Sequence, residues 1–139
     1  MCHVLGRLSW LPIESVIDPR AASEQRSKTF TGDVWADPVM PATDGVTINN
    51  VFFPPECRTD WHTHEQGQIL QVIAGRGWVC REGEAAAPLR AGDTVWIPAD
   101  ENHWHGAAAD SYLLHTAISL GKTIWGEKVT PEEFGGATK

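Results

Sequence analysis

From Phe30 onward, short apolar runs alternate with Gly, Pro and Asp, so that a turn signal recurs every eight to twelve residues. This spacing is typical of a β-sandwich or barrel. Within a strand, successive side chains point to opposite faces, so each run can line an interior with every second residue. We therefore predict an all-β, antiparallel, single-domain fold. The expected strands are 31–36, 46–53, 57–63, 68–74, 76–82, 94–98, 102–107 and 111–120.

The two ends of the chain differ from this pattern. Residues 1–29 are mixed and then polar, which predicts an N-terminal arm before a barrel domain over 30–139. The segment "TPEEFGG" at 130–136 predicts a short C-terminal helix, with Thr130 as N-cap, Pro131 in the first turn and glycines to end it. We find no repeat, low-complexity tract or second domain.

Charge and cysteine content exclude several classes of protein. The formal net charge of −7 gives no electrostatic attraction to nucleic acid or anionic lipid. No apolar run approaches the roughly 18 residues of a membrane helix, and the first residues lack the pattern of a signal peptide. Cys2, Cys57 and Cys80 are widely spaced and form no CxxC pair, which predicts free thiols and a cytoplasmic protein.

Five of the six histidines form a group that the strand pattern can bring together. They are His62, His64, His103, His105 and His115. Residues i and i+2 of a strand share a face, so each HxH pair can point inward. Imidazole is a common ligand for Zn, Cu, Fe, Ni and Mn, so two inward pairs predict a metal site. His3 stands alone in the arm, and we expect it to be idle.

A glutamine lies close to the first histidine pair. The run "QILQVIAG" is apolar at both alternating positions, which predicts a strand that is buried on both faces. A buried amide needs a hydrogen-bond partner, so either Gln68 or Gln71 must face something polar inside. A metal ion would satisfy the carbonyl oxygen of Gln68, and a hydrogen bond to a neighbouring strand is the alternative.

The two histidine segments resemble the two motifs of the cupin superfamily over residues 56–107. His62, His64 and Gly75 fit the first motif, and Gly92, Pro98 and His103 fit the second. Four positions depart from the pattern: Glu56 and Asp100 replace Gly, Gln68 replaces Glu, and Ala107 replaces Asn. The resemblance implies a jelly-roll β-barrel. It also implies four metal ligands, His62, His64, Gln68 and His103, and it leaves His105 inward but off the metal.

The segments "WHTHEQGQ", "HWHGA" and "LLHTAI" look like those of the small bacterial manganese-dependent cupin hydroxynitrile lyases. This resemblance implies a divalent metal, manganese first, with Fe, Zn, Co and Ni as alternatives. It makes His105 and His115 the catalytic acid/base candidates, and their alternative role is to brace a ligand as hydrogen-bond partners. Asn49, Val51 and Ser119 would then shape the substrate pocket.

The chemistry of these donors favours a non-redox reaction. Three neutral imidazoles and an amide leave the full 2+ charge on a metal, which makes it a stronger Lewis acid and disfavours its oxidation. We predict an enzyme that acts on a small organic molecule, a C–C lyase that converts a cyanohydrin to an aldehyde and cyanide. The alternatives are a metal-dependent (Fe or Mn) dioxygenase and a non-catalytic module that binds a small ligand.

Aromatic residues complete the prediction. Trp104 lies between two inward histidines and should point away from them, into core or interface packing. Trp96 is expected in the cavity lining or the core, and one of Phe52 and Phe53 should face the cavity. Seven tryptophans and an N-terminal arm suggest a homo-oligomer, and similar cupins form dimers and tetramers.

Overall fold

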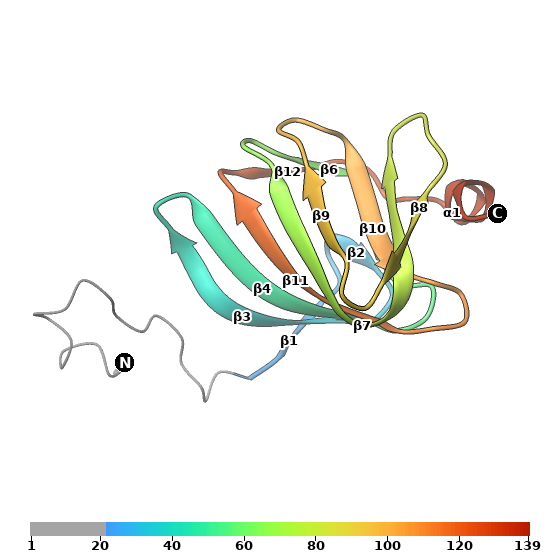
Figure 1. Cartoon of the computed structure of the whole chain (residues 1–139), viewed down its shortest axis with the longest axis horizontal. Coiled ribbons are helices and arrows are strands. Elements are labelled where there is room, and N and C mark those ends of the chain that lie inside the picture. The colour runs from blue at the N-terminus through green and yellow to red at the C-terminus, as the bar shows by residue number, and fades with distance from the viewer. Residues whose placement is uncertain (1–21) are drawn as a thin grey trace, which may run out of the picture.

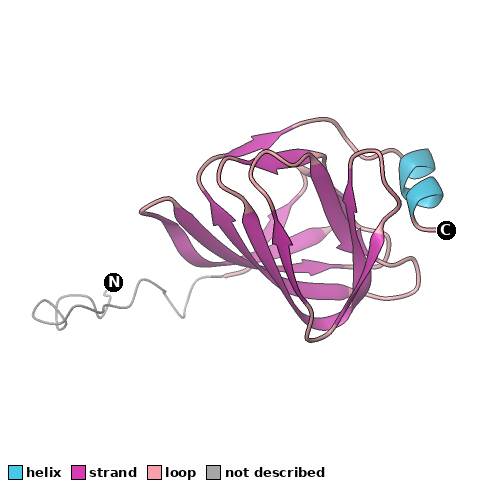
Figure 2. Cartoon of the chain, turned by 45° about the horizontal axis from the view of Figure 1, so that its top comes forward, coloured by secondary structure: helices cyan, strands magenta, loops and turns pink. Residues whose placement is uncertain are grey.

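The structure is a computed structural model, and it describes residues 22–139. Twelve strands and one short helix make up this part of the chain (Figures 1 and 2). The strands are β1 (Glu24–Arg26), β2 (Phe30–Thr31), β3 (Val34–Thr43), β4 (Val46–Phe53), β5 (Arg58–Thr59), β6 (His62–His64), β7 (Gln68–Arg81), β8 (Ala87–Arg90), β9 (Thr94–Ile97), β10 (His103–Ala107), β11 (Leu113–Leu120) and β12 (Thr123–Trp125). The helix is α1 (Pro131–Ala137). All strand pairs are antiparallel, so the predicted fold class is confirmed.

The strands form two sheets that share the long strand β7. The first half of β7 pairs with β11 and β9, and the second half pairs with β10 and β8. We call the first of these the front sheet, and it runs β1-β3-β4-β11-β7-β9. The other sheet contains β8, β7, β10, β5, β6, β2 and β12. Because β7 belongs to both, the sheets close into a nearly complete barrel (Figure 2).

The prediction of two strands at 68–74 and 76–82 is wrong, because β7 is continuous. Gly75 was expected to be a turn. It adopts a positive φ of 79° inside the strand, next to a register shift opposite Leu114 and His115. A Cβ at Gly75 would lie 2.0 Å from the carbonyl oxygen of Tyr112, so only glycine fits there. Gly75 pairs with Leu113, and the bulge itself is at Ile73, two residues earlier, near the point where β7 passes from one sheet to the other.

Other strand boundaries also differ from prediction. The expected strand 57–63 is divided into β5 and β6, because Asp60 and Trp61 donate their backbone N–H groups to Thr29 and Glu127 instead of a strand partner. Strand β3 continues well past the expected end at residue 36. It passes through Pro38 and Pro41 because β1 pairs only with residues 34–36, which leaves an edge where proline is tolerated. Strands β1, β8 and β12 were not predicted.

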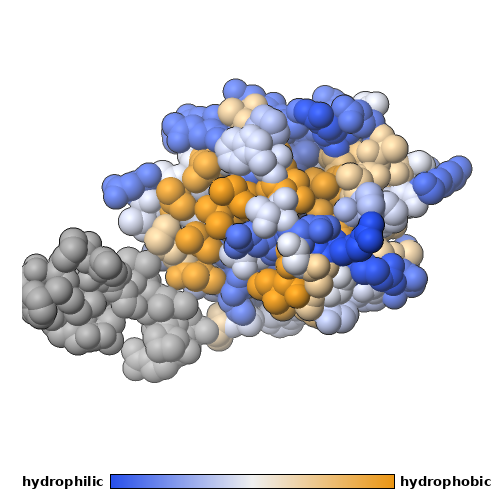
Figure 3. Space-filling view, in the orientation of Figure 1, coloured by the Kyte–Doolittle hydropathy of each residue, from blue (hydrophilic) through white to orange (hydrophobic). Residues whose placement is uncertain are grey.

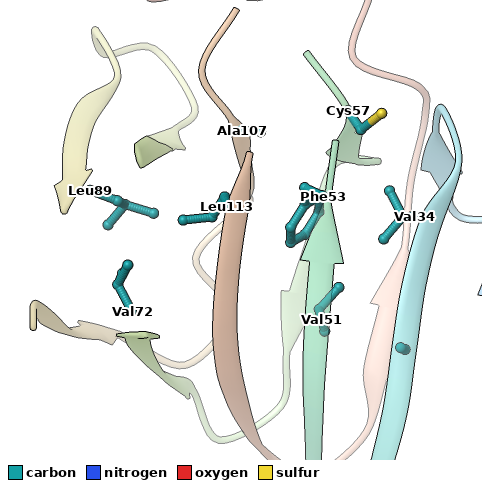
Figure 4. Packing of buried hydrophobic residues seen from close by; sticks show 9 residues of the cluster. Val34, Val51, Phe53, Cys57, Val72, Leu89, Ala107 and Leu113 are labelled. Atoms are coloured by element: carbon teal, nitrogen blue, oxygen red, sulfur yellow. The ribbon is translucent and has the colours of Figure 1, made fainter. Parts of the chain in front are cut away.

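Apolar side chains from both sheets fill one end of the barrel. Figure 4 shows this cluster, which includes Val34, Val51, Phe53, Val72 and Leu113, all buried. Cys57 belongs to the same cluster, and Cys80 is also buried; both are free thiols, as predicted. Burial raises the pKa of each thiol. Cys2 and His3 lie outside the described residues.

Helix α1 packs against the outside of the barrel, next to β10. Thr130 accepts a hydrogen bond from the backbone of Glu133, and the Glu133 side chain accepts one from the Thr130 backbone, so the predicted N-cap is confirmed as a capping box. Phe134 packs on Trp104, which is fully buried and points away from the barrel interior as expected. The glycines do not end the helix, because it continues to Ala137 and Thr138 is the C-cap.

Two side-chain predictions on the front sheet need correction. Trp96 is 55% exposed, so it does not belong to the core, although it does line a hollow that touches His103. Gln71 and Ile73 are exposed as well, so β7 is buried on one face and not on both. Of the two phenylalanines, Phe53 points inward and Phe52 outward. Within residues 22–139, no helix is long and apolar enough to span a membrane.

Candidate metal centre

Three histidines from two neighbouring strands meet inside the barrel. His62 and His64 lie on β6 and His103 on β10, and His62 is the direct antiparallel partner of His103. One nitrogen from each ring lies within 4.8 Å of the others, and this is the one such group that residues 22–139 contain. All three rings are buried. The i, i+2 spacing thus places the first pair on a common inward face, as the sequence predicts.

Hydrogen bonds at the far side of each ring fix its orientation. Nδ1 of His62 lies 2.8 Å from the Asp60 carbonyl oxygen, and Nδ1 of His103 lies 2.9 Å from the Glu101 carbonyl oxygen. A carbonyl oxygen only accepts, so both Nδ1 atoms donate and both Nε2 atoms carry a lone pair. Nδ1 of His64 is 3.0 Å from the Thr123 hydroxyl. This bracing of the outer nitrogen is characteristic of histidines that bind metals.

Gln68 supplies a fourth inward group that can bind a metal, its carbonyl oxygen. Its amide nitrogen donates to the Ser119 hydroxyl at 3.0 Å, which turns its carbonyl oxygen toward the histidines. That oxygen lies 3.3 Å from Nε2 of His103. Nε2 of a neutral His103 carries a lone pair, so this nitrogen and the Gln68 carbonyl oxygen are two hydrogen-bond acceptors that face each other. Nε2 of His64 is also buried without a hydrogen-bond partner. A cation among these atoms would satisfy all of them, so the residues fit a metal ion.

His105 and His115 form a second pair behind the first three histidines. Nε2 of His115 lies 3.0 Å from Nδ1 of His105, and both rings are buried. The His105 ring centroid is 5.3 Å from that of His62, so the pair adjoins the three-histidine group without belonging to it. Phe53 covers the pair, with its ring centroid 5.1 Å from that of His115. Nε2 of His105 and Nδ1 of His115 have no partner.

Burial keeps these five histidines neutral. Loss of solvation lowers the pKa of His62 and of His105 well below the usual value and also lowers that of His103. The same effect lowers the pKa of His64 and of His115 to about 4. At neutral pH, His105 and His115 therefore carry no charge. Neutral rings are the form that binds a metal or accepts a proton.

A hollow of ≈ 130 Å³ opens beside this group. His62, His64, Gln68 and His105 are among the residues that line it. Its walls include the three predicted pocket residues, Asn49, Val51 and Ser119. Phe30, Trp125 and Arg26 also line the hollow, and they were not predicted from the sequence. The Trp125 ring lies 4.6 Å from the His62 ring and 5.9 Å from that of Phe30. Trp125 lies on β12 and pairs with His62 on β6. This pairing could not be predicted, because a strand of only three residues leaves no recognisable pattern in the sequence.

A second hollow of ≈ 260 Å³ is lined in part by His103. Trp96, Arg81 and Glu101 contribute to its walls, and His103 is the one histidine of the group that it touches. Arg81 and Glu101 form an ion pair there. The smaller hollow touches three of the histidines and Gln68, so it is the better candidate for binding a reacting molecule.

Comparison with known proteins gives consistent results. A protein-family model described as "Cupin domain" matches residues 50–117. An (R)-mandelonitrile lyase of Granulicella tundricola is 41% identical over 124 residues, which cover 85% of this chain and 95% of that protein. A cupin-like protein of Thermotoga maritima has a crystal structure that superposes with a TM-score of 0.81 at 38% identity, covering 88% of this chain and 98% of that one.

A second Thermotoga maritima structure, described as a predicted oxalate decarboxylase, superposes with a TM-score of 0.67. It is 19% identical and covers 77% of this chain and 98% of its own. At that identity the similarity concerns the fold alone.

Proposed function

This chain belongs to the cupin family, and from that premise we propose that it is a metal-dependent lyase that cleaves a cyanohydrin into an aldehyde and hydrogen cyanide. The relative that is 41% identical over nearly its whole length is an (R)-mandelonitrile lyase. The cupin fold by itself hosts many unrelated activities, so the proposal depends on the site. There, three buried histidines and one inward glutamine line a hollow, and two further buried histidines lie behind them.

One observation carries the proposal. The carbonyl oxygen of Gln68 and Nε2 of His103 lie 3.3 Å apart although both present lone pairs, and Nε2 of His64 beside them has no partner. Such an arrangement is unfavourable unless a cation lies among the three atoms. His62, His64, Gln68 and His103 would hold a divalent ion, for which manganese is our first proposal. That ion would supply Lewis acidity, undiminished by any carboxylate ligand.

His105 is proposed to accept the proton of the substrate hydroxyl. Its Nε2 is buried without a partner, and its ring lines the hollow. When Nε2 of His105 carries the lone pair, Nδ1 of His105 carries the proton and donates a hydrogen bond to Nε2 of His115. His115 then stabilises the positive charge that forms on His105 when it takes the substrate proton. As the hydroxyl loses its proton, its oxygen forms the carbonyl bond. The electrons of the broken C–C bond leave with cyanide, which then takes the proton from His105.

The walls of the hollow suit a small substrate with one aromatic group. Phe30 and Trp125 contribute aromatic side chains to its lining, and Val51 contributes an aliphatic one. Asn49 and Ser119 add polar groups that can orient a hydroxyl or a nitrile. Mandelonitrile combines a phenyl ring with those groups, so it is the first substrate to test.

The experiment follows benzaldehyde release from mandelonitrile by the manganese-loaded protein. We expect release well above that of the metal-free protein, and a loss of at least 100-fold in His105→Ala. A matched control is Thr116→Val, which changes an outward residue of the same strand as His115. No release above the metal-free protein would contradict the proposal. Oxygen uptake by the iron-loaded protein with a phenol or diketone would favour a dioxygenase instead.

A further inference from the structure

One charged side chain faces the hollow beside the histidines, and the proposed reaction does not use it. Arg26 on β1 is the direct partner of Val34 on β3, and paired residues of neighbouring strands point to the same face. Val34 is fully buried inside the barrel, so Arg26 points inward as well. Arg26 contributes to the lining of the hollow of ≈ 130 Å³ that also touches His62, His64 and Gln68.

The charges around this hollow are unbalanced. Among the described residues that line it, Arg26 is the one charged side chain, and none is an aspartate or a glutamate. Asp60 is the one buried carboxylate among residues 22–139, and the Lys128 ammonium lies 3.1 Å from it. The lining therefore carries a net positive charge even before any metal binds.

This positive lining contrasts with the rest of the chain. The net charge is −7, so the molecule as a whole repels anions. Hydrophilic side chains lie at the surface, and Figure 3 shows blue areas around and between the orange apolar ones on the face seen in Figure 1. An inward hollow lined by a cation, in a chain of this charge, is suited to a ligand that carries a negative charge.

The guanidinium of Arg26 has hydrogen-bonding capacity left for such a ligand. Within residues 22–139 its side chain makes one hydrogen bond, from Nη2 to the Glu24 carboxylate at 2.9 Å. The Glu24 side chain is 56% exposed and does not line the hollow, and an ion pair this open to water is weak. Nε of Arg26 has no partner at all. Since an arginine presents five N–H donors in a planar fork, a carboxylate can accept two parallel bonds from it.

The same hollow contains the groups of the proposed reaction. His105 and three of the four proposed metal ligands line it, and Phe30 and Trp125 contribute aromatic side chains. Because the hollow is small, one molecule can contact the guanidinium and the histidines together. A carboxylate on one side of an aromatic ring and the reacting carbon on the other side meet this requirement.

We propose that the hollow selects an organic anion and that Arg26 binds the carboxylate of the substrate. The inference rests on the proposed function for the reacting group, so the substrate is the cyanohydrin of an aldehyde that carries a carboxylate. The carboxylate takes no part in the cleavage, which makes Arg26 a specificity-determining residue. Mandelonitrile lacks this group and is therefore a substrate without the contact to Arg26.

The first test measures binding, because binding does not depend on turnover. The probe is 4-(hydroxymethyl)benzoate, and its neutral counterpart is 4-methylbenzyl alcohol; neither contains a nitrile to be released. Both are titrated calorimetrically into the full-length protein, metal-free and manganese-loaded. We expect the anion to bind about 10-fold more tightly than the neutral compound in both forms, and the preference to weaken as salt is added.

Variants assign this preference to a residue. Arg26→Gln should reduce it to within about two-fold, and Arg26→Lys should keep part of it, because the charge remains and the planar fork is lost. Glu24→Gln should increase it, since this change frees Nη2 and removes a neighbouring negative charge. The Arg26 side chain is 39% exposed on an edge strand, so these changes leave the buried core intact. Arg90→Gln is the matched control, because it alters an exposed arginine of β8 outside the hollow, and it should keep the wild-type preference.

The second test measures kcat/KM for the cyanohydrin of 4-carboxybenzaldehyde relative to mandelonitrile, and this ratio should fall in Arg26→Gln. A wild type that binds both probes equally, or an Arg26→Gln variant that keeps the full preference, would overturn the proposal. Anion preference with no cleavage of either cyanohydrin would support the anion site and contradict the lyase function. Cleavage of mandelonitrile with no anion preference would support the lyase function and contradict this inference.

Discussion

The two ends of the barrel interior are built by the same strands but filled in opposite ways. At one end, β4, β7 and β11 contribute Phe53, Val72 and Leu113 to a dry apolar cluster. At the other end, β7 and β11 contribute Gln68 and Ser119, together with the histidines of β6 and β10, and His115 lies between the two ends, beside Phe53 and Val72. The apolar end removes side chains from water, which stabilises the fold. The histidine end keeps three ring nitrogens without partners, which costs free energy of folding.

This difference separates stability from function in space. A buried polar group without a partner persists when it has another task, such as binding a metal or moving a proton. We therefore expect changes at the histidine end to abolish metal binding and activity with little loss of stability, and changes at the apolar end to do the reverse.

The largest effect is expected for His103→Ala. The variant loses one of the three histidines and leaves Gln68 without its neighbour, so metal affinity and lyase activity should each fall by at least 100-fold. The free energy of unfolding of the metal-free protein should change less than in Leu113→Ala below. Calorimetric titration with manganese and denaturant unfolding measure the two quantities. Unchanged manganese affinity in His103→Ala would show that His103 does not bind the metal.

Leu113→Ala should have the opposite effect. Leu113 is fully buried in the apolar cluster, so the cavity should lower the free energy of unfolding by about 4 kcal/mol. Metal affinity per folded chain should stay within about two-fold of the wild type, because Leu113 touches none of the proposed ligands. Urea unfolding and a manganese titration check both parts. A large loss of metal affinity would mean that the two ends are not separate.

Acid should weaken the histidine end selectively in the metal-free protein. Burial lowers the pKa of folded His115 to about 4, whereas an unfolded histidine titrates near 6.5. Between these values the unfolded chain binds a proton that the folded chain does not, so the free energy of unfolding falls as the pH drops from about 6.5 to about 4. The loss from His115 alone is about 3 kcal/mol. Urea unfolding at a series of pH values measures it, and His115→Phe should flatten the curve. An equally steep curve in that variant would contradict this assignment.

Much of the site could be predicted from the sequence because strand alternation is local. The spacing of His62 and His64 and that of His103 and His105 fix which side chains share a face. Gln68 was predicted as a metal ligand because two observations agree: it occupies the acidic position of the cupin motif, and its strand was expected to be buried. Their long-range partners, Thr123 and Trp125, could not be predicted, because β12 has three residues and its pairing depends on the whole fold.

The missed features of the fold have physical reasons as well. Gly75 looks like a turn in the sequence, but it is a paired residue inside β7, and its positive φ and the close approach of Tyr112 explain why a glycine stands there. The prolines of β3 look like strand ends, but they lie on an edge. Apolar residues on both faces of β7 predicted burial on both sides. The structure shows instead that one of these faces is exposed, at Gln71 and Ile73.

The central claim is that a neutral amide completes a divalent metal site whose charge drives the reaction. The most direct test is Gln68→Glu, measured for manganese affinity and for kcat with mandelonitrile. We predict that the carboxylate tightens manganese binding and lowers kcat by at least 10-fold, because it cancels part of the metal charge. Gln68→Glu with unchanged kcat, or with weaker manganese binding, would contradict the account.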